Sequence, residues 1–191
     1  VPRDENFVLV SADYSQVELR IIAHASNDES MIKAFKERQD IHRATAAKVF
    51  KVKMDEVDPD MRRKAKEVNF GLIYGISSWG LAQRLNISRK EGSDIKNQYW
   101  ESYPDIKQYM DDCVEKAKKN GYAETLLGRR RYLRDINSRS SMQRSFAERN
   151  AVNAPIQGTA ADIIKIAMVN IQQAMQDEKM DSKLIIQVHA E

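Results

Sequence analysis

The pattern of apolar and polar positions predicts a chain that is mostly helical. Apolar residues recur every three or four positions, the spacing of an amphipathic helix. The predicted helices are 17–25, 28–37, 41–50, 59–75, 78–85, 88–103, 104–121, 140–153 and 158–176. Asp58 followed by Pro59 is typical of a helix start, and Gly121 is typical of a helix end. We expect Pro155 to separate the last two helices, because proline interrupts the hydrogen bonding of a helix.

Two apolar runs, 7–13 (FVLVSAD) and 183–189, predict buried strands at opposite ends of the chain. Residues 122–133 (YAETLLGRRRYL) predict a short hairpin that turns at Gly128. The two terminal strands would have to pair across most of the sequence. The predicted fold class is therefore α+β, predominantly helical, with a partial antiparallel sheet.

Composition excludes several classes of protein. The 191 residues carry a formal charge of +3, which is too mild to indicate a nucleic-acid partner by itself. The only cysteine, Cys113, excludes an internal disulfide and suits a reducing compartment. No apolar run is long enough to predict a membrane span. The chain begins at Val1 without Met and stops at Glu191 in the middle of a pattern, so we expect it to be part of a longer protein.

A zinc site is not expected. His24, His42 and His189 are scattered, and one cysteine is too few for the usual ligand sets. His24 lies on the apolar helix at 17–25, where we interpret it as a structural residue.

The predicted helix at 59–75 carries a row of two cationic side chains followed by two aromatic ones. Its members Arg62, Lys66, Phe70 and Tyr74 follow one another at steps of four residues and so share a face. Two cations followed by two aromatic rings match the order of phosphates, sugar and base in a nucleoside triphosphate. A solvated basic end followed by a core-facing aromatic end explains the same spacing, and the pattern alone does not separate the two interpretations.

Two carboxylates lie near the end of the first predicted strand. Asp13 is at its tip and Glu18 is on the helix that follows. A carboxylate in this position is suited to Mg²⁺, which binds one or two carboxylates together with water and phosphate. In the alternative interpretation, Asp13 or Ser15 caps the helix that begins near Gln16. If the two terminal strands pair, Asp13 would lie beside the 189–191 tip.

A second polar row precedes the helix at 158–176. Arg149, Asn153 and Gln157 repeat every four residues, and these are residue types that read base edges in DNA. The region from Arg129 to Arg149 also lacks lysine and contains seven arginines that could neutralise phosphates. A solvated basic surface is the alternative interpretation. The other arginines are Arg130, Arg131, Arg134, Arg139 and Arg144.

Five stretches in this order resemble the polymerase core of family A DNA polymerases, the bacterial DNA polymerase I type. They are VSADYSQVELRIIAHAS, MRRKAKEVNFGLIYG, GRRRYL, NAPIQGTAADIIKIAM and LIIQVHAE. The resemblance spans essentially the whole chain and implies the fingers and part of the palm. It implies palm at 1–27, fingers at 28–134 with the nucleotide-binding helix at 59–75, and palm again at 135–191.

The resemblance also implies roles for single residues. Two Mg²⁺ ions would be held by Asp13, the backbone carbonyl of Tyr14 and an aspartate of the last motif, with Glu191 as an adjacent catalytic acid. Lys66 would act in catalysis as well as in nucleotide binding. The implied dNTP-binding residues are Gln16, Glu18, His42, Arg62, Lys66, Phe70 and Tyr74. The implied primer-template contacts are Arg149, Asn153, Gln157 and His189.

The last motif departs from the family pattern of His-Asp-Glu, because Ala190 lies between His189 and Glu191. Alanine cannot bind a metal, and the side chain of Glu191 would point to the opposite face of a strand. We therefore expect the chain as written not to polymerise DNA. A non-catalytic module that binds primer-template DNA or nucleotide is the alternative, while Glu18 argues against a related RNA polymerase because it would crowd a ribose 2′-OH.

The resemblance implies a bacterial cytoplasmic location, with an organellar relative as the alternative. The sequence gives no indication of oligomeric state.

Overall fold

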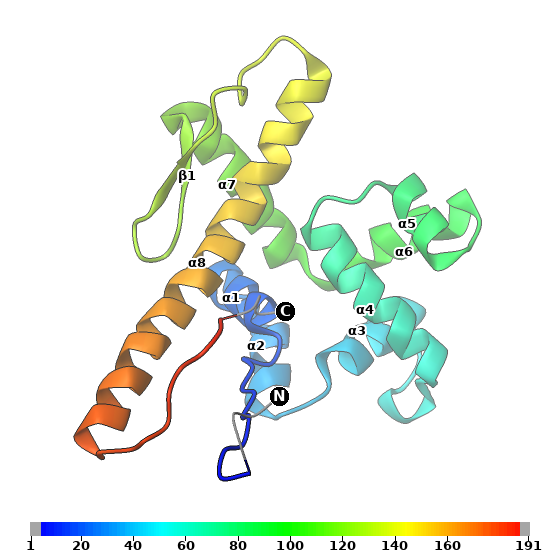
Figure 1. Cartoon of the computed structure of the whole chain (residues 1–191). Helices are drawn as coiled ribbons and strands as arrows, with labels where there is room; N and C mark the ends of the chain where they lie inside the picture. Colours follow the sequence, from blue (N-terminus) through cyan, green and yellow to red (C-terminus); the bar gives the residue numbers. More distant parts are fainter. Residues whose placement is uncertain (1–4, 188–191) are drawn as a thin grey trace.

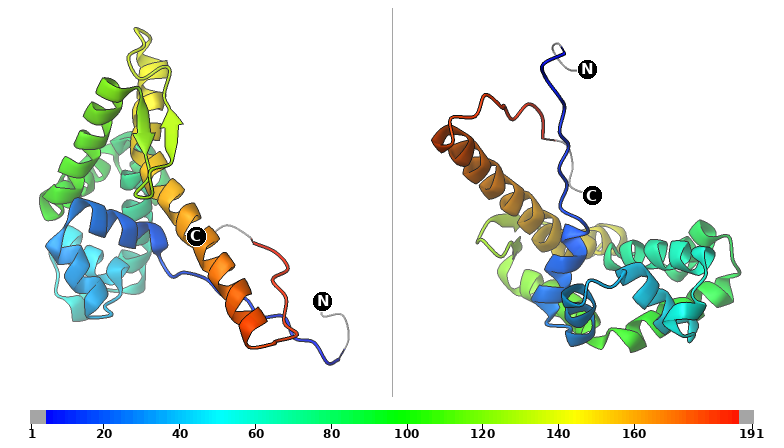
Figure 2. Two further views of the ribbon diagram at one scale, coloured as in Figure 1. Left: turned by 90° about the vertical axis from the view of Figure 1, so that its left-hand side faces the viewer. Right: turned by 90° about the horizontal axis from the view of Figure 1, so that it is seen from below.

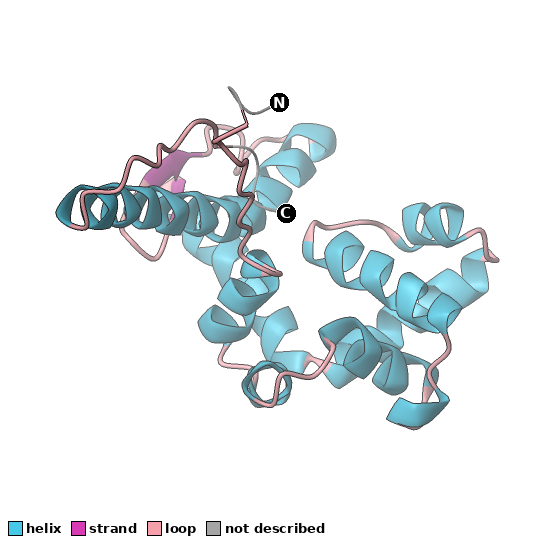
Figure 3. Cartoon of the chain, turned by 60° about the horizontal axis from the view of Figure 1, so that its bottom comes forward, coloured by secondary structure: helices cyan, strands magenta, loops and turns pink. Residues whose placement is uncertain are grey.

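A computed structural model describes residues 5–187 of the chain and confirms the predicted fold class (Figures 1 and 3). The described part contains eight α-helices, one 3₁₀ helix and one antiparallel pair of strands. In chain order the elements are α1 (Val17–Ser26), α2 (Glu29–Lys36), α3 (Ile41–Phe50), η1 (Met54–Glu56), α4 (Pro59–Ile73), α5 (Ser78–Leu85), α6 (Arg89–Ser102), α7 (Pro104–Asn120), β1 (Tyr122–Glu124), β2 (Arg130–Tyr132) and α8 (Ser141–Asp177).

Side-chain caps explain why most of these helices begin where the sequence predicts. The first turn of a helix leaves backbone N–H groups without partners, and a short polar side chain before it can accept their hydrogen bonds. Five helices, α2 to α6, are capped in this way. Their capping residues are Asp28, Asp40, Asp58, Ser77 and Ser88.

One apolar core connects the helices that carry the candidate site. Its largest buried members include Leu19 and Ile22 of α1, Leu72 of α4, Tyr99 of α6 and Ile156 of α8. Helix α3 packs along α4, α5 packs along α6, and α8 packs against both α1 and α7. The core therefore fixes α1, α4 and α8 relative to one another, although they are far apart in the sequence.

The prediction that Pro155 separates two helices is wrong. Helix α8 is continuous from Ser141 to Asp177 and crosses the molecule diagonally in Figure 1, with Pro155 inside it. A proline within a helix removes one hydrogen bond and costs about 3 kcal/mol. Burial offsets this cost, because Val152, Ile156 and Ala160 pack into the main core on both sides of the proline.

The prediction of strands at 7–13 and 183–189 is also wrong for the described residues. Residues 7–14 and 180–187 form no strand, and within 5–187 the only sheet is the pair β1–β2. Both segments run outside the packed helices (Figure 2). Val8, Val10 and Ile186 are 81%, 86% and 80% exposed, so the apolar pattern predicted burial that these segments do not have. Residues 188 and 189 lie outside the described part.

The predicted hairpin is confirmed, and its tip is bound to α8. Strands β1 and β2 pair with Tyr122 opposite Tyr132. Thr125 donates a hydrogen bond to one carboxylate oxygen of Asp162 on α8 (2.9 Å), and Arg129 binds the other oxygen (2.8 Å). Arg129 also donates to the backbone oxygen of Gly158 (2.9 Å).

Gly158 allows this close approach, which gives a test of the docking. A Cβ atom at Gly158 would lie 2.5 Å from Cγ2 of Thr125. We expect Gly158→Ala to lower the free energy of unfolding by about 1 kcal/mol, because overpacking of about 1–3 kcal/mol exceeds the gain in helix propensity of about 1 kcal/mol. Urea-induced unfolding followed by circular dichroism measures this difference.

Thr125→Ser supplies the matched background, because it removes the clashing methyl group and keeps the hydroxyl that binds Asp162. In that background, Gly158→Ala should be neutral or stabilising. A single Gly158→Ala variant more stable than the parent would contradict the described docking.

Candidate functional site

The row of cations and rings lies along α4 with its two halves in different environments. Arg62 and Lys66 are exposed, whereas Phe70 and Tyr74 are half-buried, with Phe70 packed against the main core. The two interpretations of the spacing are therefore compatible: the basic half faces solvent and the aromatic half borders the core. The α4 row is the name used below for these four residues.

Asp40 connects the start of α3 to the basic half of the α4 row. Its carboxylate caps α3 through the backbone N–H groups of His42 and Arg43, and its other oxygen accepts from Nε of Arg62 at 2.6 Å. Burial raises the pKa of Asp40, but the hydrogen bonds from Arg62 and the backbone outweigh it and leave the pKa below its usual value. Asp40 is therefore charged at neutral pH and holds the guanidinium of Arg62 in place.

His42 is a buried residue beside this ion pair. Its side chain is 3% exposed, its ring centroid lies 5.9 Å from that of Phe70, and Asn69 of α4 contacts its Nδ1 at 3.1 Å. Burial lowers the pKa of His42 to about 4, with Asp40 opposing this shift and the cations Arg62 and Lys66 adding to it. At neutral pH the imidazole is consequently uncharged.

The aromatic end of the α4 row meets α1 at a single hydrogen bond. The hydroxyl of Tyr74 donates to a carboxylate oxygen of Glu18. Burial raises the pKa of Glu18. Two residues that the sequence proposes for the same nucleotide thus lie in contact, although 56 positions separate them.

The alternative prediction that Asp13 or Ser15 caps α1 is wrong. The residue at the start of α1 is Gln16, which has a left-handed backbone (φ 56°) and makes no side-chain cap. The left-handed residue turns the chain into the helix without a capping side chain, and the backbone oxygen of Ser15 accepts from Arg20 instead (3.1 Å).

Asp13 and Tyr14 are exposed residues just before α1. Within residues 5–187 there is no group of three or more His, Cys, Asp or Glu side chains that could hold a metal ion. Asp13 therefore belongs to no such group within these residues, and His24 is exposed on α1 rather than part of the core. The predicted positions His189, Ala190 and Glu191, and their convergence with Asp13, lie outside the described residues.

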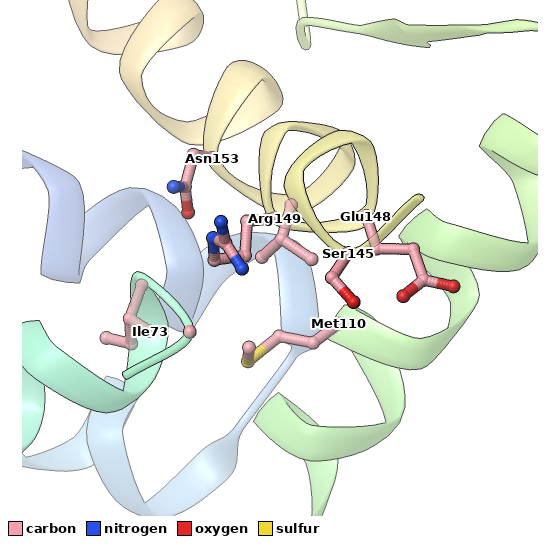
Figure 4. A pocket seen from close by; sticks show the side chains of 8 residues that line it. Ile73, Met110, Ser145, Glu148, Arg149 and Asn153 are labelled. Carbon is pink, nitrogen blue, oxygen red and sulfur yellow. The ribbon is translucent and has the colours of Figure 1, made fainter. Parts of the chain in front are cut away.

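Arg149 lies in an open hollow between α4, α7 and α8 (Figure 4). The hollow has a volume of about 240 Å³ and is lined by Ile73, Gly75, Met110, Asn153 and others. Gly75 has φ of +78°, and a Cβ on it would lie 2.9 Å from Cγ of Arg149, so glycine is needed here both for conformation and for space.

Asn153 lies one helical turn after Arg149 on the same side of α8 (Figure 4). The oxygen of its side-chain amide, Oδ1, is buried and has no hydrogen-bond partner among the described residues. An unpartnered buried acceptor is costly, so a hydrogen-bond donor that reached this oxygen would stabilise it.

The neighbouring arginines differ in their partners within the described part of the chain. Arg129 is occupied by Asp162, Arg130 by Glu124 at 2.6 Å, and Arg144 donates to a backbone oxygen. The exposed residues in the same region include Arg131, Arg134, Arg139 and Gln157. Gln157 lines a second hollow of about 250 Å³ between the hairpin and α8.

Sequence reasoning missed two residues that shape the site, Asp40 and Asn69. Asp40 had a recognisable signal, since an aspartate directly before a helix is a typical cap. Asn69 had a weaker one, a polar residue within the apolar stretch VNFGLI, and it is fully buried.

The pKa of His42 predicts a loss of stability in mild acid. Between pH 6.5, the ordinary pKa, and about pH 4 the unfolded chain binds a proton at this position and the folded chain does not. The free energy of unfolding should therefore fall as the pH decreases through this range. Urea unfolding at several pH values measures the slope.

The same measurement on His42→Gln should show a smaller slope over this pH range. The matched control is His24→Gln, the same substitution at an exposed histidine. Equal slopes in the parent and in His42→Gln would contradict the burial of a neutral imidazole at this position.

Comparison with known proteins covers the whole chain. The sequence model of DNA polymerase family A matches residues 1–191. The DNA polymerase I proteins of Bacillus caldotenax and Bacillus subtilis are 52% and 50% identical over the full chain, which spans 22% of each relative. The polymerase domain of Pol1 from M. smegmatis, solved with a DNA primer-template and dNTP, has a TM-score of 0.89 at 47% identity, over 93% of this chain and 31% of that one. The chain belongs to DNA polymerase family A.

Proposed function

We propose that this chain is the nucleotide-binding part of a template-directed DNA polymerase, which adds dNTPs to a primer 3′-OH. The observation that carries the proposal is the convergence of three distant helices on one site. Tyr74, directly after α4, binds Glu18 of α1, and Gly75 lines the same hollow as Arg149 of α8. The structural relative solved with a DNA primer-template and dNTP supports the choice of ligands.

In this proposal the α4 row binds the incoming dNTP along its length. Arg62 and Lys66 bind the phosphates, since a guanidinium forms paired hydrogen bonds with phosphate oxygens and an ammonium acts as a compact charge. Phe70 and Tyr74 pack against the sugar and the base. Lys66 also stabilises charge that develops on the phosphates during the reaction. The other proposed nucleotide contacts are Gln16, Glu18 and His42.

The polar row of α8 binds the primer-template in this proposal. The continuous helix places Arg149, Asn153 and Gln157 on successive turns. Each of these three side chains can donate hydrogen bonds to DNA. His189 is proposed as a further contact from outside the described residues.

The proposed division into subdomains follows the same assignment. Residues 28–134, with the α4 row, form the fingers, and residues 1–27 and 135–191 contribute to the palm. The main core crosses this division, since buried side chains of α1, α4 and α8 belong to one cluster.

Family A polymerases use divalent metal ions, and the donors present here do not fit a pair of them. The sequence supplies the carboxylate of Asp13 and the carbonyl of Tyr14, but Ala190 in place of the second aspartate. Two Mg²⁺ ions in a polymerase need carboxylates that bridge them. We therefore propose no metal-dependent step for this chain and infer that it does not polymerise DNA as written.

Ala190 favours the second candidate function, a module that binds primer-template DNA or nucleotide without catalysis. Its binding residues on α4 and α8 are the same as those of the polymerase. The two candidates therefore differ only in catalysis.

A chimera tests the proposal. The 191-residue segment replaces its counterpart in the Bacillus subtilis relative, once as written and once with Ala190→Asp. With Mg²⁺ and dNTPs, we expect extension of a primed template only after Ala190→Asp, and a loss of at least about 1,000-fold without it. The unmodified relative is the positive control, and a gel-shift assay reports primer-template binding in each protein.

Normal primer-template binding without extension in the Ala190→Asp chimera would reject the polymerase and favour the binding module. Equal extension by both chimeras would reject the role given to Ala190.

Selection of deoxynucleotides gives a second test in the Ala190→Asp chimera. We expect Glu18→Ala to raise use of rNTP relative to dNTP about tenfold or more, because removing the side chain opens space for a 2′-OH. The ratio of kcat/KM for rNTP and dNTP measures the effect.

Glu18→Gln is the matched control, since it keeps the size of the side chain and loses its charge. We expect it to retain most of the discrimination. An unchanged ratio in Glu18→Ala would contradict a steric role for Glu18.

A further inference from the structure

A chain of four buried polar side chains leads from the core to the candidate nucleotide site. Tyr103, which precedes α7, lies 3.0 Å from the hydroxyl of Thr45 on α3. Thr45 donates to Oδ1 of Asn69 on α4 at 3.2 Å, and Nδ2 of Asn69 lies 3.1 Å from Nδ1 of His42. Each of the four residues is at most 3% exposed.

The orientation of the Asn69 amide, with Oδ1 toward Thr45 and Nδ2 toward His42, sets the direction of every hydrogen bond in this chain. The hydroxyl of Thr45 has one proton, and Asn69 Oδ1 receives it, so Tyr103 is the donor to Thr45. With Oδ1 occupied as an acceptor, the amide presents its NH₂ group to His42. Because an amide nitrogen only donates, Nδ1 of His42 is an acceptor and carries no proton.

The neutral imidazole of His42 then has its single proton on Nε2. This nitrogen is on the side of the ring away from Asn69, as the geometry of imidazole requires. The charged groups whose fields act on the ring are Asp40 of α3 and the cations Arg62 and Lys66 of α4. His42 therefore offers a fixed N–H donor close to the residues proposed to bind phosphate.

We propose that Asn69, oriented by Thr45 and Tyr103, is a positioning residue that fixes the Nε2–H tautomer of His42 for hydrogen bonding to the phosphates of the incoming nucleotide. Its consequence for the ligand rests on the proposed function, whereas the tautomer itself does not. A donor without charge binds phosphate with the same strength across the neutral pH range. A lowered pKa for His42 agrees with this arrangement.

Asn69→Asp reverses the arrangement with almost no change in shape. A carboxylate only accepts, so it draws the proton to Nδ1 and leaves Nε2 of the neutral ring without one. It also raises the pKa of His42. Below that pKa the imidazolium again carries a proton on Nε2, and above it the donor is lost.

The kinetic test uses the Ala190→Asp chimera with and without Asn69→Asp. We expect the KM for dNTP in the parent chimera to be constant from about pH 6 to about pH 8. In Asn69→Asp, KM should rise about tenfold as the pH rises through the new pKa of His42, with a smaller change in kcat. If Asn69 had only a structural role, the Asn69→Asp enzyme would not regain dNTP binding at low pH.

A spectroscopic test does not depend on catalysis. Nitrogen-15 NMR of the histidine-labelled 191-residue chain distinguishes a protonated Nε2 from a protonated Nδ1. The chain has three histidines, and single His→Gln variants assign their signals. We expect Nε2–H for His42 in the parent chain and a protonated Nδ1 in Asn69→Asp.

The two tests separate the possible failures. A parent chain with a protonated Nδ1 on His42, or an Asn69→Asp enzyme with a flat KM profile, would overturn the inference. A chimera that binds DNA and does not extend the primer would reject the proposed function, and the NMR result would still decide the tautomer. If Asn69→Asp does not fold, Thr45→Val takes its place, with the expectation that His42 populates both tautomers once the amide is no longer oriented.

Discussion

The packing of α3 against α4 holds the charged and the neutral parts of the candidate site in one arrangement. Ala65, Val68 and Leu72 bury one side of α4, which leaves Arg62 and Lys66 exposed on another side. Polar groups inside such a contact are costly unless they are paired. Here they are paired across the two helices, and the same pairs determine how the site can bind a ligand.

Hydrogen bonds between polar groups restrict the register of α3 against α4 more strongly than apolar packing does. Apolar side chains tolerate small shifts between helices, whereas the hydrogen bond between Asn69 and His42 requires one register and one orientation of the amide. The bond from Arg62 to Asp40 is a weaker contact between the same two segments, about two turns away from Asn69 along α4. A ligand that spans several turns of this helix would therefore meet hydrogen-bond donors that are already in position.

Local signals in the sequence were sufficient for most of the helices and for the α4 row. Periodicity and capping residues such as Asp58 and Ser88 act within a few positions, so they can be read without a structure. The hairpin at Gly128 was predictable for the same reason. The two-helix prediction around Pro155 failed because a local rule competed with burial of Val152 and Ile156, which depends on distant residues.

The pattern of apolar and polar residues could not predict contacts between segments that are distant in the sequence. The runs at 7–13 and 183–189 have the composition of buried strands, but a strand also needs a neighbour, and composition does not supply one. The bond between Tyr74 and Glu18 joins positions far apart in the chain, and no spacing rule predicts it. The role of Asn69 could not be predicted for the same reason, because it depends on hydrogen bonds with Thr45 and His42 of α3.

The partner of Arg62 bears on how a triphosphate would enter the site in the proposed function. The Arg62 and Asp40 side chains are 46% and 34% exposed, and an ion pair this open to water contributes about 1 kcal/mol or less. A phosphate offers the guanidinium two parallel hydrogen bonds, which are stronger. The exchange of partners is therefore favourable, while Asp40 keeps its backbone hydrogen bonds at the start of α3 and stays charged. Asp40 thus positions the guanidinium of Arg62 through a hydrogen bond that is weak enough for a phosphate to displace.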